Sequence, residues 1–407
     1  MRRAVYALGW LGICSIWPAH AIEFTATPQL SMGARATDNV LFSSDNLQDA
    51  LGFDTGGSLN LSGQSNTYRT TLTPALNVRR FAVGEDLDAD EYGIRSDHQW
   101  KLSELLSATL KADYYQDSTL STELTDVGRQ NDVADRDTLT LQPGIIYQLD
   151  AKNAVNLGFA YTDVTTEPKA NLVDYTYSQA SLGGTHLLSE TMQAFLSGFV
   201  SWFDVPSVQS STATYGLQTG VTWQWDEFTR LEGSIGYLSS DIDFIDQFFA
   251  IVADPVPRIV LVKEARKAST SGPIAGFSIS RSFEYLKTSF QYSRQVSPTV
   301  RGQQSLEDSM SVGVDYQVSR ELTAGISGQY NIRASQSEQV KFAEGSLNAD
   351  QISTSGYLAY RCSQHSTVRA EYRYSHQELT TSFTSASTNG VFLTLNYAGD
   401  PFSFGVW

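Results

Sequence analysis

The chain has 407 residues and a net charge of −16, with 28 Lys plus Arg against 44 Asp plus Glu. That acidic balance excludes nucleic acid as an expected partner. The chain has only two cysteines, Cys14 and Cys362, which excludes a fold stapled by several disulfides.

Residues 1–21 have the three parts of a secretory signal peptide. Arg2 and Arg3 supply positive charge, residues 4–17 are apolar, and Ala19-His20-Ala21 is a small-x-small cleavage signal. We expect this segment to be removed, which leaves a mature chain from Ile22. The loss of two positive charges lowers the net charge from −16 to −18.

The remaining residues, 22–407, repeat one unit of alternating apolar and polar residues followed by a turn. In residues 311–318, Val312, Val314, Tyr316 and Val318 alternate with small or polar residues. A period of two places alternate side chains on opposite faces of a sheet. A sheet with lipid on one face and water on the other is typical of a closed outer-membrane barrel. We therefore predict one all-β domain, a transmembrane antiparallel up-and-down β-barrel.

The strands follow one another with connections that alternate between short and long, as in transmembrane barrels. The pattern predicts about eighteen strands, with sixteen as the alternative count. Whether residues 22–50 form a wall strand or a plug stays open, and residues 401–407 could be a short tail. The predicted ranges are 24–41, 51–62, 67–81, 90–102, 106–118, 137–149, 154–166, 173–188, 191–204, 213–225, 229–243, 272–282, 285–297, 308–318, 322–335, 350–361, 366–378 and 389–398.

Aromatic residues gather near the ends of these strands, for example Trp100, Trp202 and Trp223. Two aromatic girdles at the membrane interfaces would explain this placement. A soluble β-sandwich or β-solenoid is the alternative, but it does not explain the alternating connection lengths.

The longest outer connection, residues 245–271, is unusually apolar on both sides of Asp254-Pro255-Val256-Pro257. Such a segment could rise above the membrane as an extended hairpin, or fold inward and narrow the pore. We favour the hairpin, because both arms have strand-like composition.

Four short motifs resemble the porin 2-type putative β-barrel porins of Gram-negative outer membranes. They are residues 28–31 with Thr37-Asp38-Asn39-Val40, then residues 72–76, residues 117–128, and residues 141–147. The resemblance implies a location in the outer membrane of a Gram-negative bacterium, and some similar proteins are associated with exopolysaccharide secretion. It supplies no catalytic residues.

The polar face of the strands is the candidate functional surface, because a charge on the lipid face is costly near the bilayer midplane. An arginine-rich wall facing a carboxylate-bearing wall could act as a selectivity filter that favours anions. The bland alternative is that cross-strand pairs neutralise these charges and stiffen the wall. The predicted pore-lining residues are Arg95, Asp97, Lys101, Lys111, Asp113, Asp315, Arg333, Arg361, Arg369, Glu371 and Arg373.

Signals for catalysis are weak. None of the histidines after residue 21 stands at metal-ligand spacing, and no nucleophile elbow or phosphate-binding loop occurs. We expect no enzymatic activity, no catalytic residues, no metal and no cofactor.

The sequence therefore favours passive diffusion of small polar solutes through the barrel, with a leaning towards anions. The first alternative is a conduit or anchor for exopolysaccharide secretion, in which a sugar would contact interior aromatics such as Tyr115 or Tyr357. The second is a structural or adhesive barrel without conductance. Expected partners are outer-membrane lipid and lipopolysaccharide, the barrel-insertion machinery and, for the first alternative, a polysaccharide; a homo-oligomer stays open.

Overall fold

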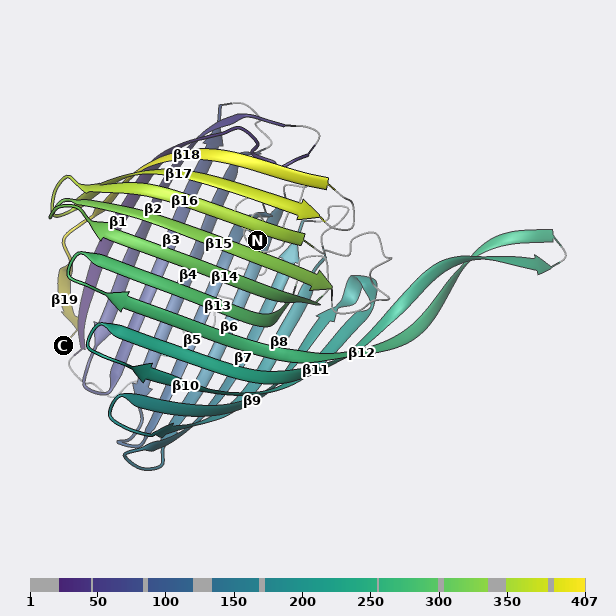
Figure 1. Cartoon of the computed structure of the whole chain (residues 1–407), viewed down its shortest axis with the longest axis horizontal. Helices are drawn as coiled ribbons and strands as arrows, with labels where there is room; N and C mark the ends of the chain where they lie inside the picture. Colours follow the sequence, from purple (N-terminus) through teal and green to yellow (C-terminus); the bar gives the residue numbers. More distant parts are fainter. Residues whose placement is uncertain are drawn as a thin grey trace.

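The computed structural model describes residues 22–44, 47–82, 87–119, 134–167, 173–254, 256–298, 304–335, 349–379 and 384–406. The strands form one tilted, closed sheet, with short hairpins at one end and the longer connections at the other (Figure 1). No helix in these residues is long and apolar enough to cross a membrane. The predicted signal peptide lies outside the described residues.

The elements follow the chain in a simple up-and-down order. They are β1 (Ile22–Thr37), β2 (Ala50–Gln64), β3 (Tyr68–Phe81), β4 (Ala89–Lys101), β5 (Leu106–Ser118), β6 (Asp135–Gln148), β7 (Asn153–Thr166), β8 (Tyr175–Leu187), β9 (Met192–Val205), the 3₁₀ turn η2 (Pro206–Val208), β10 (Ser210–Gln224), β11 (Thr229–Asp254), β12 (Val256–Ser282), β13 (Leu286–Pro298), β14 (Gln304–Gln317), β15 (Leu322–Ser335), β16 (Ala349–Arg361), β17 (Ser366–Leu379), β18 (Thr384–Ala398) and β19 (Phe402–Val406).

The sheet closes because β1 pairs on one side with β2 and on the other with both β18 and β19. Gln29 is opposite Ala398 and Ala26 is opposite Phe402, so three residues of the last strand face two of β1. Such a bulge bends the strand while pairing continues beyond it. β18 and β19 therefore share one position in the wall. The barrel thus has eighteen strand positions, not sixteen.

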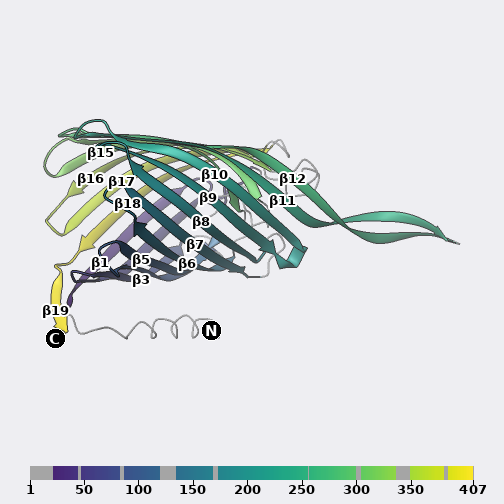
Figure 2. The ribbon, with the colours of Figure 1, turned by 90° about the horizontal axis from the view of Figure 1, so that it is seen from below.

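Two open questions from the sequence are answered by this closure. Residues 22–37 are a wall strand, not a plug. The idea that residues 401–407 are a tail is wrong for Phe402–Val406, because this segment pairs with Ile22–Ala26 beyond the short-hairpin end (Figure 2).

The motif at residues 37–40 holds the seam of the barrel together at the end with long connections. The side chain of Asp38 accepts hydrogen bonds from the backbone and side-chain nitrogens of Asn389, at 2.7 and 2.6 Å. Asn39, which is 1% exposed, donates to the carbonyl oxygens of Ser43 and Ser387. The motif therefore connects β1 to β18 across the closure, which is a structural reason for its polar residues.

The two faces of the wall differ as the period of two predicts. Large apolar side chains on the outward face are exposed, such as Ile235 (69%) and Ile326 (63%). The aromatic residues Trp100, Tyr147, Trp223 and Trp225 form an outward belt near the short hairpins, where Trp223 stacks on Trp225 with ring centroids 4.8 Å apart. A second outward belt lies near the other end and contains Tyr92, Tyr114, Tyr161, Trp202, Tyr237, Tyr292, Tyr330 and Tyr374.

One turn design recurs at the short-hairpin end. A Ser or Asp at the first turn position accepts hydrogen bonds from backbone N–H groups two and three residues later, as Ser103, Asp150 and Ser319 do. These residue types satisfy nearby backbone donors in this way in Asx- and ST-turns. The same chemistry therefore fixes several hairpin registers.

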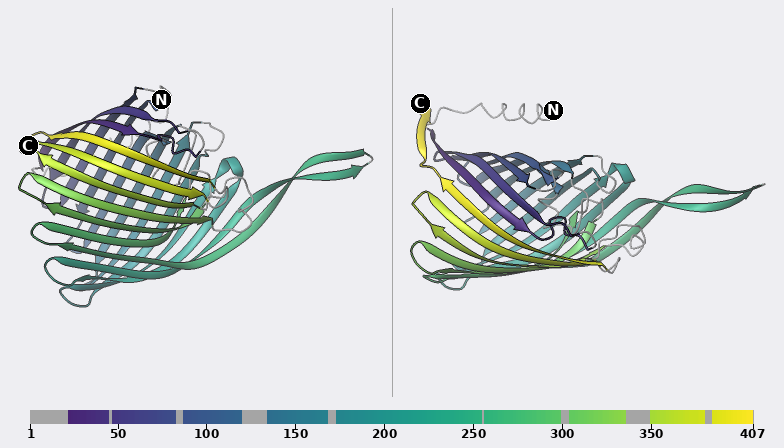
Figure 3. Two further views of the ribbon diagram at one scale, coloured as in Figure 1. Left: turned by 45° about the horizontal axis from the view of Figure 1, so that its top comes forward. Right: turned by 90° about the horizontal axis from the view of Figure 1, so that it is seen from above.

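The longest connection is a hairpin, as the sequence favoured. β11 and β12 stay paired from Thr229 opposite Arg281 to Asp254 opposite Val256. Beyond the wall they continue as a twisted two-stranded ribbon that projects away from the barrel (Figures 1 and 3). The alternative in which residues 245–271 fold inward to narrow the pore is wrong for this structure.

Two small apolar clusters lie at the long-connection end. One joins Val40, Ala50, Phe81 and Leu87, and so packs the connections after β1 and β3 against the wall. The other joins Val164, Tyr175, Phe203 and Val205 on β7, β8 and β9. Between these clusters and the short hairpins, the interior face is mainly polar.

Candidate functional site

Two parts of the interior face of the barrel differ in chemistry, and β11, with its own inward pair Arg230 and Glu232, and β12 lie between them. We call β13–β18 together with β1–β6 the charged wall, because their inward positions carry most of the interior Arg, Lys, Asp and Glu. We call β7–β10 the neutral wall, because no described inward position on these strands is charged.

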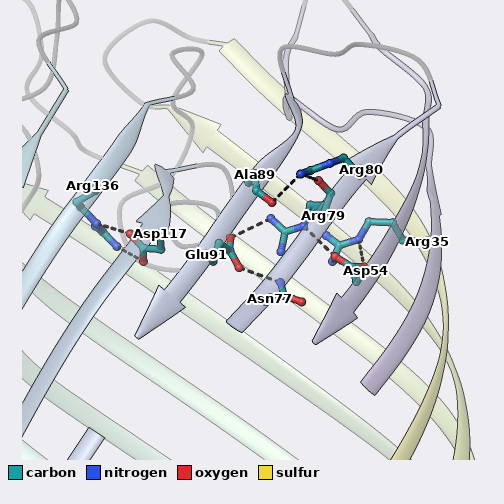
Figure 4. Close-up of polar contacts among 9 residues, drawn as sticks. All are labelled: Arg35, Asp54, Asn77, Arg79, Arg80, Ala89, Glu91, Asp117 and Arg136. Carbon is teal, nitrogen blue, oxygen red and sulfur yellow. Dashed lines mark hydrogen bonds and ion pairs between the residues drawn. The ribbon is translucent and has the colours of Figure 1, made fainter. Parts of the chain in front are cut away.

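A continuous ladder of ion pairs crosses β1 to β4 (Figure 4). Arg35 donates to both carboxylate oxygens of Asp54, at 2.8 and 2.7 Å. Arg79 lies between Asp54 (3.0 Å) and Glu91 (3.3 Å), and Asn77 donates to the second oxygen of Glu91 at 2.9 Å. Positive and negative groups alternate from strand to strand, so the ladder is compensated.

The side chains of the ladder pack against the wall and are largely shielded from solvent. The side chain of Arg79 is only 7% exposed and that of Glu91 16%. A charge this far from water needs a partner, since removal of one member of a buried pair costs several kcal/mol. We infer that this ladder stabilises the region where the chain closes on itself.

Two other interior pairs near the long-connection end are similarly buried. Arg136 binds Asp117 through two hydrogen bonds of 3.1 and 3.0 Å. Arg333, 6% exposed, donates to Glu307 at 2.9 Å. In each pair the positive and negative charges cancel, so neither pair adds a net charge to the interior.

The predicted residues on β4 and β5 also occur in pairs, but these pairs are open to solvent. Arg95 lies 3.0 Å from Asp113, and the Arg95 side chain is 66% exposed. Lys111 is 3.9 Å from Asp97. Lys101, at the end of β4, has no ion pair among the described residues. Exposed pairs of this kind contribute little to stability, so their charges are available to solutes.

A larger cluster lies on β14 to β17. The two carboxylate oxygens of Glu371 accept hydrogen bonds from the guanidinium groups of Arg369 and Arg373, each with an N···O distance of 2.7 Å. The guanidinium of Arg369 lies 3.8 Å from the ring centroid of Tyr357, whose hydroxyl donates to Asp315. One carboxylate is thus shared by two arginines, and both arginine side chains are at least 40% exposed.

The structure brings together some of the predicted residues and separates others. Arg369, Glu371, Arg373 and Asp315 meet in this one cluster. Arg333 and Arg361 share its face, but Arg333 belongs to the Glu307 pair at the long-connection end and Arg361 lies at the opposite end of β16. These arginines therefore lie at three separate levels along the barrel and do not form one patch.

The partners of Glu371 also differ from the expected cross-strand arrangement. Both arginines lie two residues away on β17 itself, on the same face. Sequence reasoning missed Arg35, Asp54, Arg79, Glu91 and Glu307 as interior groups. The signal was only partial, because Arg79, Glu91 and Glu307 each have a charged outward neighbour, Arg80, Asp90 and Asp308 respectively. Strand register alone shows which of the interior residues meet.

The neutral wall contains aromatic side chains directly opposite glycines. Phe195 is paired with Gly220 and Phe199 with Gly216. A Cβ added to Gly216 would lie 2.2 Å from the Phe199 ring, so the ring occupies the space above the glycine. The same arrangement occurs on the charged wall, where Tyr115 lies over Gly93 and Tyr357 over Gly325.

Guanidinium groups cover the two tyrosines but not the two phenylalanines. Arg95 lies 5.7 Å from the Tyr115 ring centroid, and Arg369 lies over Tyr357. For Phe195 and Phe199, no cation or second ring stacks on them among the described residues. Tyr115 and Tyr357 are thus poorly placed to stack a sugar, contrary to expectation.

Metal chemistry finds no support in the described ranges. They contain no cluster of three His, Cys, Asp or Glu side chains suited to a metal ion. His98 lies on the outward face beside Tyr68 and Trp100, and His365 lies in a short turn. The expectation that the protein is not an enzyme stays a prediction.

No family model and no curated protein matches the chain. Solved structures do match in shape. The outer membrane protein opdK from Pseudomonas aeruginosa is 12% identical with a TM-score of 0.48, over 94% of this chain and 99% of that one. Acinetobacter baumannii OccAB4 is 11% identical with a TM-score of 0.49, over 94% and 99%.

The ferric-catecholate import receptor Fiu from E. coli is 10% identical with a TM-score of 0.46, over 94% of this chain and 82% of that one. At these scores and identities, the likenesses carry no statement about solutes or partners. The resemblance to porin 2-type proteins stays a prediction.

Proposed function

We propose that the protein is an outer-membrane channel for passive diffusion of small polar solutes in a Gram-negative bacterium. The observation that carries the proposal is a closed cylinder of eighteen positions with exposed apolar side chains outside and polar ones inside. In a soluble protein this outward apolar face would be exposed to water, whereas in a membrane lipid covers it. A barrel of this size is wide enough for water in its interior.

In this membrane the short hairpins face the periplasm and the β11–β12 ribbon projects outside the cell, as is usual for such barrels. Lipid and lipopolysaccharide then contact the outward belts. The same proposal includes assembly by the barrel-insertion machinery after removal of residues 1–21.

We further propose a modest preference for anions. Apart from the Arg333–Glu307 pair, the inward positions of β14 to β17 carry three arginines, Arg361, Arg369 and Arg373, against two carboxylates, Asp315 and Glu371, which leaves an excess of one positive charge. The remaining interior charges are largely compensated in pairs. Charged rings and walls select ions by their net field, so this excess of positive charge should decide the sign.

Reversal potentials in planar bilayers under a salt gradient test both parts. The wild-type protein should conduct and favour chloride. The double variant R369S/R373S should lose this preference or become cation-selective, since Glu371 is then unpaired. The control R95S/D113N removes one charge of each sign and should leave selectivity nearly unchanged.

Absence of conductance from correctly folded protein would overturn the channel proposal and favour a structural or adhesive barrel. Unchanged selectivity in R369S/R373S would overturn the anion preference alone.

A further inference from the structure

Phe195 and Phe199 lie on the same inward face of β9, four residues apart. At about 3.3 Å per residue, their positions are separated by roughly 13 Å along the strand. Ser197 lies between them on the same face. Each phenylalanine is only partly exposed, because one side of its ring packs on the glycine opposite.

A hollow with hydroxyl and amide groups in its lining adjoins the Phe199 end of this pair. Its volume is about 240 Å³, and its lining includes Gln142, Gln179 and Ser181. Ser181 is directly opposite Phe199 in the β8–β9 register. Gly144 and Gly158 face each other in the same hollow, where the hydroxyls of Thr109 and Ser181 lie close to these two glycines.

The groups in reach are therefore flat aromatic rings, hydroxyls, side-chain amides and the ammonium group of Lys111, which lines the hollow. Lys111 lies 3.9 Å from Asp97, so its charge is compensated. An inorganic ion finds no counter-charge on β7–β10, and a purely apolar ligand would leave the amides of the hollow without partners. A polyhydroxylated ring offers C–H groups to the negative face of an aromatic ring and hydroxyls to the amides.

We propose that Phe195, Phe199 and the adjoining hollow bind successive sugar rings of a linear, uncharged oligosaccharide. The separation of the two rings requires several linked sugars, so a monosaccharide cannot contact both. This inference rests on the proposed function, since it names a solute class for the same interior. The glycine opposite each ring keeps the ring flat on the wall and so leaves the passage open.

Channel block tests the inference, with maltohexaose as the probe and glucose as its single-ring control. Maltohexaose should reduce wild-type conductance at concentrations where an equal mass of glucose does not. The variant F195L/F199L keeps apolar volume but removes both rings, and should weaken the block roughly tenfold or more. Y115L is the matched control, because Tyr115 also lies over a glycine but is covered by Arg95, and it should leave the block unchanged.

Calorimetric titration of maltohexaose into the refolded protein in detergent provides a second measurement that does not need conductance. Equal affinity of wild type and F195L/F199L, or an equal loss in Y115L, would overturn the inference. A conducting wild-type channel that does not bind maltohexaose would also overturn it and leave the proposed function intact. Binding without conductance would support the inference while the channel proposal fails.

Discussion

The charged and neutral walls are built from the same strand pattern, yet they stabilise the barrel in different ways. On the charged wall, Arg35, Asp54, Arg79 and Glu91 hold neighbouring strands together through side-chain ion pairs. On the neutral wall, a ring fills the space over a glycine, as Phe199 does over Gly216. Ring–glycine packing also occurs on the charged wall, as at Tyr115 over Gly93, so the walls differ in that only the charged wall adds cross-strand ion pairs to it.

The two walls also differ in the groups that they expose to a solute. Buried, compensated pairs such as Arg333 and Glu307 contribute little field to the interior, whereas Arg369 and Arg373 share one carboxylate and remain exposed. The charged wall thus contains both structural and solute-facing groups. The neutral wall offers surfaces that do not depend on charge.

The largest expected effect comes from breaking the ladder of the charged wall. Asp54→Asn leaves Arg35 and Arg79 without their shared carboxylate, and should cost about 3 kcal/mol of unfolding free energy. Urea unfolding in lipid or detergent, followed by tryptophan fluorescence, measures the loss. Asp113→Asn is the control, because its partner Arg95 is largely exposed; it should cost less than about 1 kcal/mol. Equal losses would contradict the division into structural and solute-facing pairs.

A smaller effect is expected from the corresponding change on the neutral wall. Gly216→Ala places a methyl group 2.2 Å from the Phe199 ring, which must move. We expect a loss of roughly 1–3 kcal/mol, as for other overpacked sites. Gly233→Ala is the control, because its added Cβ meets nothing within 4 Å and should cause no loss. If both variants unfold at the same denaturant concentration, the ring over Gly216 contributes no support.

The smallest expected effect concerns acid pH and the two turns at which the neutral wall begins and ends. A side-chain hydrogen bond from Asn153 lowers the pKa of Asp150, and a backbone hydrogen bond from Phe228 lowers the pKa of Asp226. A carboxyl whose pKa is lowered on folding stabilises the protein above its unfolded pKa, and this contribution is lost as the pH falls through the folded value. Stability should therefore decline below the ordinary aspartate pKa of 3.8.

The double variant D150S/D226S isolates this contribution. Serine already occupies the equivalent position at Ser103 and Ser319, so the turns should form without an ionisable group. Its unfolding midpoint should change less between pH 6 and pH 3 than that of the wild type. An identical acid response in both proteins would show that other carboxyls dominate.

The family-like motif at residues 37–40 illustrates what sequence patterns can and cannot reveal. Asp38 and Asn39 stand out in the sequence, but their task of joining β1 to β18 appears only when the two ends of the chain meet. The short connections were easier to predict from the sequence, because the hydrogen bonds of one Ser or Asp side chain lie entirely within its own turn. Local chemistry was predictable, and contacts across hundreds of residues were not.

The sequence by itself predicted most of the strand ranges and the face of most strand side chains, and it favoured eighteen wall positions over sixteen. These properties follow from a period of two and from local turns. Only the tertiary structure decided the partners. A register slip of two residues keeps every side chain on its face, yet it would separate Arg79 from Asp54 and Phe199 from Gly216. For the same reason Arg333 and Arg369 could be assigned to one face from sequence, while their separation along the barrel could not.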